Sequence, residues 1–153
     1  FHSKVIDIDL KNLNVLDLYA GSGSFGIECL SRNASKVVFV EKDSDAILNL
    51  EKNIRNINLF KNSKIVSKDV LEFFNKFILG DYIKFNVIFF DPPYQDISFV
   101  NSFKIIKKNH FLCKNHIIII HRESKSDDDL QKYIKIIENR TYGRSEIFFG
   151  KIF

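Results

Sequence analysis

The chain has 153 residues, a hydrophobic fraction of 45% and 16 phenylalanines, which together supply a substantial core and exclude an intrinsically disordered protein. The apolar runs are far too short to span a bilayer and no signal-peptide pattern is present, so we expect a soluble, cytoplasmic protein without membrane contact. The net charge of +4 mildly favours an anionic partner, but lysines scattered along the chain serve solubility equally well.

Residues 1–153 are long enough for one domain, and we expect a single domain that is monomeric. The two cysteines, Cys29 and Cys113, suit unpaired thiols in a reducing compartment better than a disulfide framework. Because the sequence contains no methionine, even at position 1, we expect its amino-terminal end to be trimmed.

Apolar strands alternate with helical patterns along most of the chain. After a stretch at 1–12 that we expect to be the end of a preceding helix plus a linker, strands are predicted at 14–19, 36–41, 64–67, 85–90 and 116–121. Helices are predicted at 25–33, 43–57, 69–77, 98–108 and 126–138. Two strand-like pieces around Gly143, within residues 140–153, predict an antiparallel hairpin. This pattern predicts an α/β fold: a mostly parallel, seven-stranded sheet with helices on both faces.

A glycine-rich turn, Gly21-x-Gly23-x-x-Gly26, follows the first strand and opens a helix, the context in which this motif binds a nucleotide. Glu41 ends the next strand, where it is placed to accept hydrogen bonds from ribose hydroxyls. These features do not separate NAD from S-adenosylmethionine, and a packing turn without a ligand is the alternative. Asp17 favours S-adenosylmethionine, because a carboxylate repels a pyrophosphate and attracts an ammonium or sulfonium group.

Asp69, at the end of the third strand, is placed to accept a hydrogen bond from an adenine amino group. A plain helix N-cap is an equally good interpretation, and both roles can hold at once. Neighbouring residues complete the predicted cofactor-binding set, which is Asp17, Tyr19, Ala20, Gly21, Ser22, Gly23, Glu41, Lys42, Asp69, Val70 and Asp91.

The fourth strand ends in Asp91-Pro92-Pro93-Tyr94. The prolines end the strand ladder and hold the backbone extended at the edge of the sheet where ligands bind. This motif has no explanation in a dehydrogenase, whereas it suits methyl transfer to an exocyclic amino nitrogen. Asp91 and the Pro92 carbonyl are placed to accept the two N–H bonds while Tyr94 stacks on the base. We therefore predict Asp91, Pro92, Pro93 and Tyr94 as the catalytic residues; a simple strand terminator is the alternative.

These motifs together resemble a class I S-adenosylmethionine-dependent methyltransferase with a Rossmann-like fold. The segment from Asp17 to Arg32, above all Glu28-x-Leu30-Ser31-Arg32, resembles the RsmD family of bacterial ribosomal RNA guanine-N2 methyltransferases. The later Ile120-His121-Arg122-Glu123 and the Tyr142-Gly143 hairpin fit the same family in order and spacing.

The resemblance implies S-adenosylmethionine as cofactor and a guanine of ribosomal RNA, within a small-subunit particle, as target. It also implies a basic amino-terminal RNA-binding segment, which is missing from this sequence. The alternatives are an N6-adenine methyltransferase, a cofactor-binding module without turnover, and an NAD-dependent oxidoreductase, which Asp17 disfavours.

Several other polar residues are less informative. His110, Cys113, His116 and His121 match no common metal-ligand spacing, so we predict no metal site. The acidic run 127–129 is interpreted as the N-terminal charge of the predicted helix at 126–138. Arg122 and Lys125 are placed either to reach a phosphate or, slightly better, to lie solvated on the surface.

Overall fold

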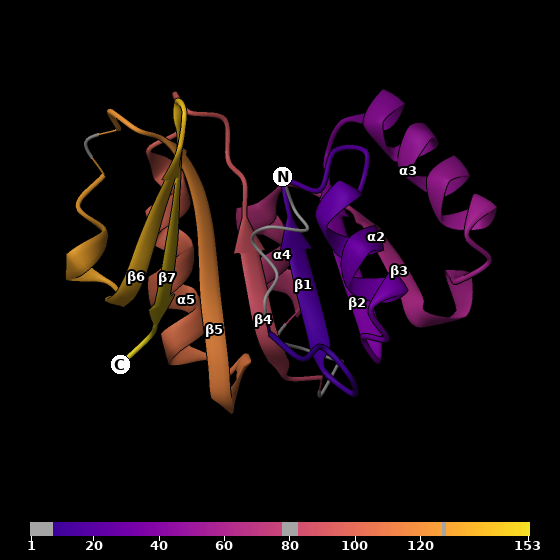
Figure 1. The fold of residues 1–153 in the computed structure, drawn as a ribbon, viewed down its shortest axis with the longest axis horizontal. Coiled ribbons are helices and arrows are strands. Elements are labelled where there is room, and N and C mark those ends of the chain that lie inside the picture. The colour runs from indigo at the N-terminus through magenta and orange to yellow at the C-terminus, as the bar shows by residue number, and fades with distance from the viewer. Residues whose placement is uncertain (1–7, 78–82, 127) are drawn as a thin grey trace.

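The computed structural model describes residues 8–77, 83–126 and 128–153, with Phe77 described without its side chain. Within these ranges seven strands form one sheet in the order β3-β2-β1-β4-β5-β7-β6 (Figure 1). The strands are β1 Asn14–Leu18, β2 Lys36–Glu41, β3 Ser63–Ser67, β4 Phe85–Phe90, β5 Leu112–Glu123, β6 Lys135–Tyr142 and β7 Ser145–Lys151. The first five strands are parallel, and β7 runs antiparallel to both β5 and β6. The predicted fold class is confirmed.

Helices cover both faces of this sheet. The described helices are α2 Ser24–Ser31, α3 Ser44–Asn56, α4 Val70–Phe77 and α5 Asn101–Lys108, with 3-10 turns at Phe60–Asn62, Ser98–Val100 and Leu130–Lys132. Side chains of α2 and α3 belong to one buried cluster, and side chains of α4 and α5, which lie behind the sheet in Figure 1, belong to the other. Among the described residues no helix is long and apolar enough to cross a bilayer.

Strand β4 is buried on both faces because it lies in the middle of the sheet. Val87 and Phe89 point to the α2 side, where Phe25 stacks on Phe89 with ring centroids 4.0 Å apart. Ile88 and Phe90 point to the α5 side. An uninterrupted apolar run is what a central parallel strand requires, and it carries the chain directly into Asp91 at the carboxyl edge.

The predicted helix at 126–138 is wrong. The described part of this segment holds a 3-10 turn at Leu130–Lys132 and then enters strand β6 at Lys135. Leu130 and Ile134 are both buried and are four residues apart, which imitates helical periodicity. Pairing of β6 with β7 along Lys135–Tyr142 outweighs this local pattern, so the predicted hairpin is confirmed but begins earlier in the chain.

Two smaller differences concern element bounds. Strand β5 begins at Leu112 instead of 116, because its first residue pairs with Phe85 before a register shift, and it ends at Glu123, where it still pairs with β7. Residues 8–12 contain no helix, and residues 1–7, on which the rest of that prediction falls, lie outside the described residues.

Gly26 is a packing requirement of the first βα unit. A Cβ atom at this position would lie 2.3 Å from Phe39 Cε1 and 2.8 Å from Val37 Cγ1. We expect Gly26→Ala to lower the free energy of unfolding by about 1–3 kcal/mol, because side chains of β2 must move to admit the methyl group. Urea unfolding of this variant beside Ser22→Ala, at an exposed position of the same turn, measures the effect; equal stability of the two variants would contradict it.

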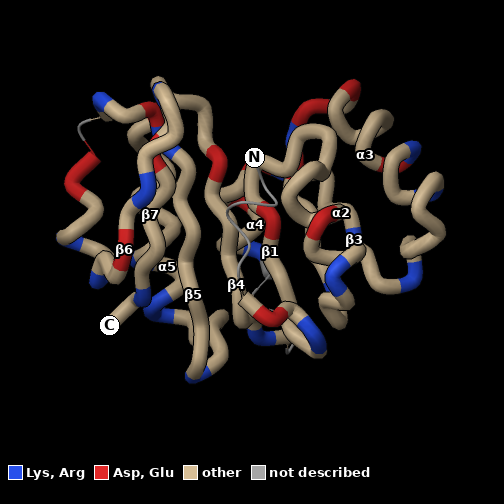
Figure 2. Tube along the Cα trace, viewed as in Figure 1, with Lys and Arg blue, Asp and Glu red and all other residues tan. Residues whose placement is uncertain are grey.

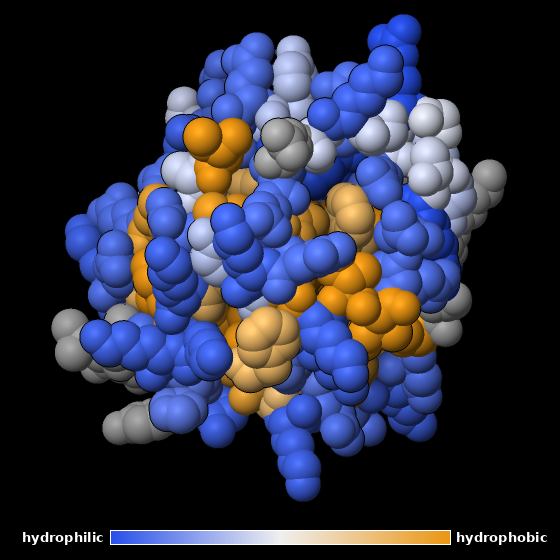
Figure 3. Space-filling view, turned by 90° about the vertical axis from the view of Figure 1, so that its left-hand side faces the viewer, coloured by the Kyte–Doolittle hydropathy of each residue, from blue (hydrophilic) through white to orange (hydrophobic). Residues whose placement is uncertain are grey.

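The surface is mixed in character. Figure 2 shows Lys and Arg distributed along the whole described trace, so the net charge of +4 is spread over the molecule. On the side formed by the hairpin, hydrophobic surface lies between hydrophilic side chains (Figure 3). Ile137 and Phe153 are 55% and 64% exposed. Single exposed apolar side chains are ordinary on protein surfaces.

Candidate functional site

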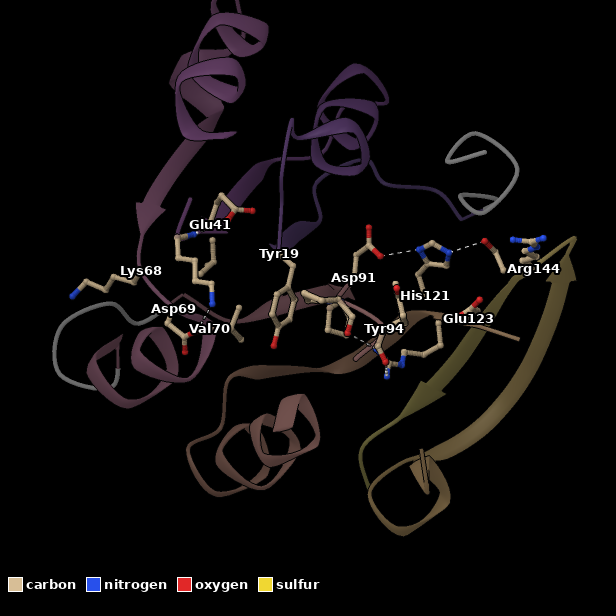
Figure 4. Close-up of a pocket in the computed structure, with 16 residues that line it drawn as sticks. Tyr19, Glu41, Lys68, Asp69, Val70, Asp91, Tyr94, His121, Glu123 and Arg144 are labelled. Carbon is tan, nitrogen blue, oxygen red and sulfur yellow. Dashed lines mark hydrogen bonds and ion pairs between the residues drawn. The ribbon is translucent and has the colours of Figure 1, made fainter. Parts of the chain in front are cut away.

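Two adjoining cavities open at the carboxyl edge of the sheet. The larger, of about 490 Å³, lies over the ends of β1 to β5 and the β6–β7 turn (Figure 4). It is lined by Tyr19, Val40, Glu41, Lys42, Lys68, Asp69, Val70, Asp91, Pro92, Pro93, Tyr94, His121, Arg122, Glu123, Arg144 and Ser145. The smaller, of about 190 Å³, is lined by Asp17, Tyr19, Ala20, Gly21, Ser22, Ser24, Phe25, Phe89 and Asp91. Tyr19 and Asp91 border both cavities, which together have the size of a small-molecule site.

The glycine turn is joined to the end of β2 by a hydrogen bond. Gly21 has a φ of +56° and open space where a Cβ would stand, and its N–H donates to Glu41 Oε2 at 2.8 Å. The other oxygen of Glu41 accepts the N–H groups of Lys42 and Asp43. A carboxylate has about four acceptor positions, so Glu41 retains room for a hydroxyl donor from a ligand.

Asp17 is a buried carboxylate on the wall of the smaller cavity. It is 1% exposed, and its Oδ2 accepts the N–H of Gly26 at 3.0 Å. Burial raises the pKa of Asp17 well above its ordinary value, and the nearby charges of Asp91 and Glu41 add to the rise. A cation in this cavity would therefore relieve an unfavourable negative charge.

Asp69, at the end of β3, both caps a helix and lines the larger cavity. Its Oδ1 accepts the N–H of Leu71 at 3.0 Å, a capping contact at the start of α4, and its side chain lines the larger cavity. Lys42 Nζ lies 3.8 Å from Asp69 Oδ2, with both side chains largely exposed. In Figure 4 the ring of Tyr19 stands between the group formed by Glu41 and Asp69 and the group formed by Asp91 and Tyr94.

Asp91 is the start of a polar chain that crosses three strands. Its Oδ1 lies 2.8 Å from His121 Nδ1, and His121 Nε2 lies 2.9 Å from Ser145 Oγ (Figure 4). Because a carboxylate only accepts, Nδ1 carries the hydrogen of the contact with Asp91. Within the described residues Asp91 Oδ2 accepts no hydrogen bond, and Asp91 borders both cavities.

Most of the predicted cofactor-binding residues lie on the cavity walls. Gly23 does not: its φ is +84° and its Cβ position would be 2.2 Å from Leu50 Cδ1, so it lies at the packing contact with α3. Sequence reasoning missed Lys68, His121, Glu123, Arg144 and Ser145, which also line the larger cavity. Because the carboxyl ends of parallel strands meet at one edge of the sheet, the position of His121 directly after the apolar run of β5 indicates that it lies at this edge. The position of Ser145 beside the hairpin turn indicates the same for Ser145.

Arg122 contradicts both expectations made for it. It is 2% exposed and forms an ion pair with Asp128, so it is neither a solvated surface residue nor a free phosphate contact. The interpretation of the acidic run as helix N-terminal charge is also wrong, because no α-helix follows in the described part of the segment. Asp128 pairs with Arg122 and Asp129 with Lys132, while Asp127 lies outside the described residues.

The predicted absence of a metal site remains a prediction. Among the described residues no three His, Cys, Asp or Glu side chains gather in a metal-binding arrangement. His116 Nδ1 lies 2.9 Å from the Cys113 carbonyl, and His116 Nε2 accepts the N–H of Ile152.

Comparison with known proteins identifies the family. The sequence family described as Conserved hypothetical protein 95 matches residues 3–151. The chain belongs to this family. It is 33% identical over 116 residues to Ribosomal RNA small subunit methyltransferase D of Buchnera aphidicola, covering 76% of this chain and 59% of that protein. It is 32% identical over 180 residues to an uncharacterized methylase of Rickettsia prowazekii, covering 90% of this chain and 75% of that one.

The family assignment confirms the resemblance to RsmD-like methyltransferases. A solved structure of another protein, complexed with SAH, superposes on this chain with a TM-score of 0.78 at 15% identity. The superposition covers 99% of this chain and 48% of that chain. At this identity the likeness shows the fold, which is that of class I methyltransferases. Asp17, Gly21 and Glu41 fit S-adenosylmethionine, the cofactor that the resemblance to RsmD-like methyltransferases implies. The chain spans 59% of the length of the Buchnera aphidicola relative.

Proposed function

We propose that this protein transfers the methyl group of S-adenosylmethionine to the exocyclic N2 of a guanine in small-subunit ribosomal RNA. The observation that carries the proposal is Asp91, whose Oδ1 is held by His121 while its carboxylate borders both cavities. The smaller cavity carries Asp17 and the glycine turn, and the larger carries Glu41 and Asp69 as well as Tyr94. A cofactor held by Asp17, Glu41 and Asp69 would therefore meet a target base stacked on Tyr94 at Asp91.

On the cofactor side, residues of three strand ends would bind and orient S-adenosylmethionine, which supplies an electrophilic methyl group when bound. Glu41 would accept the ribose hydroxyls, and Asp69 would accept the adenine amino group. The buried carboxylate of Asp17 would attract the positive end of the cofactor, and the bound cation would in turn favour the charged form of Asp17, whose pKa burial raises in the free protein.

On the substrate side, the lone pair of an exocyclic amino nitrogen is delocalised into the base and is a weak nucleophile. Asp91 and the Pro92 carbonyl would accept its two N–H bonds and fix the nitrogen towards the methyl group. Tyr94, 63% exposed beside the prolines, would stack on the base. As positive charge develops on the nitrogen, the Asp91 carboxylate stabilises it until the proton is lost.

The choice of ribosomal RNA is supported by relatives named ribosomal RNA small subunit methyltransferase D, and the choice of guanine follows the resemblance to the RsmD family. The Asp91-Pro92-Pro93-Tyr94 motif itself suits any planar amino group, so an N6-adenine methyltransferase is the second candidate. We further propose that the protein acts as a cytoplasmic monomer on the RNA of a small-subunit particle.

Label transfer to different macromolecules tests this proposal. Full-length protein is incubated with methyl-labelled S-adenosylmethionine and, separately, with unmodified small ribosomal subunits, free small-subunit RNA and duplex DNA. We expect label in the ribosomal RNA. Label in DNA alone would indicate an adenine methyltransferase, and binding of the cofactor without transfer to any of them would indicate a module without turnover. Binding of NADH but not of S-adenosylmethionine would contradict the cofactor assignment.

A further inference from the structure

The loop that follows β4, residues 92–98, is held by one buried guanidinium group. We call these residues the acceptor loop, because they follow Asp91 and carry Tyr94. Arg122 Nη1 donates to the Pro93 carbonyl at 3.1 Å, and Nη2 donates to the carbonyls of Tyr94 at 2.9 Å and Asp96 at 3.3 Å. A side chain from β5 thus fixes the backbone of the acceptor loop at three points.

The remaining N–H groups and the face of this guanidinium also have partners. Its Nε lies 2.5 Å from Asp128 Oδ2, Nη2 lies 3.2 Å from Asp128 Oδ1, and the guanidinium carbon lies 4.7 Å from the centre of the Phe99 ring. The Arg122 side chain is 1% exposed and the Asp128 side chain 5%. Burying an ion pair is costly, and apolar residues often replace one without loss of stability. We therefore attribute to the Arg122–Asp128 ion pair the role of fixing the geometry of the acceptor loop, not that of stabilising the fold.

Hydrogen bonds within the acceptor loop hold it as well. The Asp96 carboxylate accepts the N–H and the hydroxyl of Ser98 at 2.7 and 2.6 Å, and the Asp96 N–H donates to the Pro93 carbonyl at 2.8 Å. Burial and the nearby carboxylates of Asp96 and Asp69 raise the pKa of Tyr19, which borders both cavities.

We propose that Arg122 is a positioning residue for methyl transfer, which acts by holding the acceptor loop so that Tyr94 and the Pro92 carbonyl meet the target base in a fixed geometry. The proposal rests on the proposed function for its catalytic part. Lysine cannot replace Arg122, because a single ammonium group does not reach three carbonyls and a carboxylate in one plane. Asp128 keeps the guanidinium in that plane.

The chain offers a matched control in Arg140. Its guanidinium also pairs with a carboxylate, with Nε 2.5 Å from Glu138 Oε1, and also stacks on a phenylalanine, with its carbon 4.6 Å from the centre of the Phe149 ring. It lies on the hairpin strand β6. Arg140→Lys therefore makes the same chemical change without removing a contact to the acceptor loop.

The experiment compares Arg122→Lys, Arg140→Lys and the unchanged full-length protein. Amide hydrogen exchange of residues 94–98 is measured first, and we expect at least about tenfold faster exchange only in Arg122→Lys, because the loop loses its fixed carbonyls. Single-turnover methyl transfer to small-subunit RNA should fall about 100-fold in the same variant, as a misplacement of about 1 Å does. The dissociation constant of S-adenosylmethionine should stay within about threefold, or roughly 0.7 kcal/mol.

If Arg122→Lys does not fold, the double variant Arg122→Met/Asp128→Leu removes the guanidinium and its partner together and leaves an apolar pair. Unchanged exchange of residues 94–98, or faster exchange with unchanged transfer, would overturn the proposal. Equal losses of transfer in Arg122→Lys and Arg140→Lys would also overturn it. If the unchanged protein transfers no methyl group, the proposed function fails, and the exchange data alone decide whether Arg122 holds the loop.

Discussion

Replacement of Asp91 by alanine is expected to abolish methyl transfer while the affinity for S-adenosylmethionine stays within about tenfold, or roughly 1.4 kcal/mol. Alanine removes both the acceptor for the amino group and the negative charge that stabilises the nitrogen as it becomes positive. It also releases His121, whose Nδ1 lies 2.8 Å from Asp91 Oδ1. The proposed cofactor contacts of Asp17 and Glu41 are left in place.

Single-turnover transfer and calorimetric binding of the cofactor measure these two effects separately. Glu51→Ala, which removes an exposed carboxylate of α3, is the control and should change neither quantity. Transfer by Asp91→Ala at nearly the rate of the unchanged protein would contradict the role assigned to Asp91. A loss of cofactor affinity much larger than tenfold would instead place Asp91 on the cofactor side of the site.

The second large effect concerns Asp17. We expect Asp17→Asn to weaken S-adenosylmethionine binding by at least about 2 kcal/mol, roughly 30-fold, because a buried opposite charge is lost from the complex. Asparagine keeps an oxygen that can accept the N–H of Gly26, a contact of 3.0 Å in this protein. The loss should therefore reflect the charge and not a collapse of the turn.

The same substitution should stabilise the ligand-free protein at neutral pH. Because burial raises the pKa of Asp17 in the folded state, the protonated form contributes stability that is fully present at low pH and is lost as the pH rises through that pKa. Asparagine has no such loss. Urea unfolding of both proteins at several pH values should therefore give nearly equal stabilities in acid and a growing advantage for the variant as the pH rises. An Asp17→Asn variant that binds the cofactor normally, or that is less stable at neutral pH, would contradict this account.

Local patterns in the sequence were enough to predict the parallel part of the fold. Asp43, the first residue of the predicted helix at 43–57, accepts the N–H of Ala46 at 2.8 Å as an N-cap, and Lys36–Glu41 and Phe85–Phe90 are strands with the predicted bounds. The residues expected at the carboxyl edge meet there because parallel strands share that edge. Asp17, Glu41, Asp69 and Asp91 follow this rule.

What the sequence did not reveal depends on contacts between distant segments. Arg122 reaches carbonyls 26 to 29 positions away in the chain, and nothing in its own neighbourhood indicates burial. The segment at 126–138 carries a helical spacing of apolar residues, yet strand pairing with β7 decides its structure. His121 was assessed as a metal ligand and as part of the family resemblance, and neither indicates its contact with Asp91.

The identity of the methylated nucleoside decides whether guanine N2 is the target. Small-subunit RNA labelled by the full-length protein is digested to nucleosides, which are separated and identified by mass spectrometry. We expect the label in N2-methylguanosine, and none from Asp91→Ala. Label in N6-methyladenosine, or in any nucleoside not methylated on an exocyclic amino nitrogen, would contradict it.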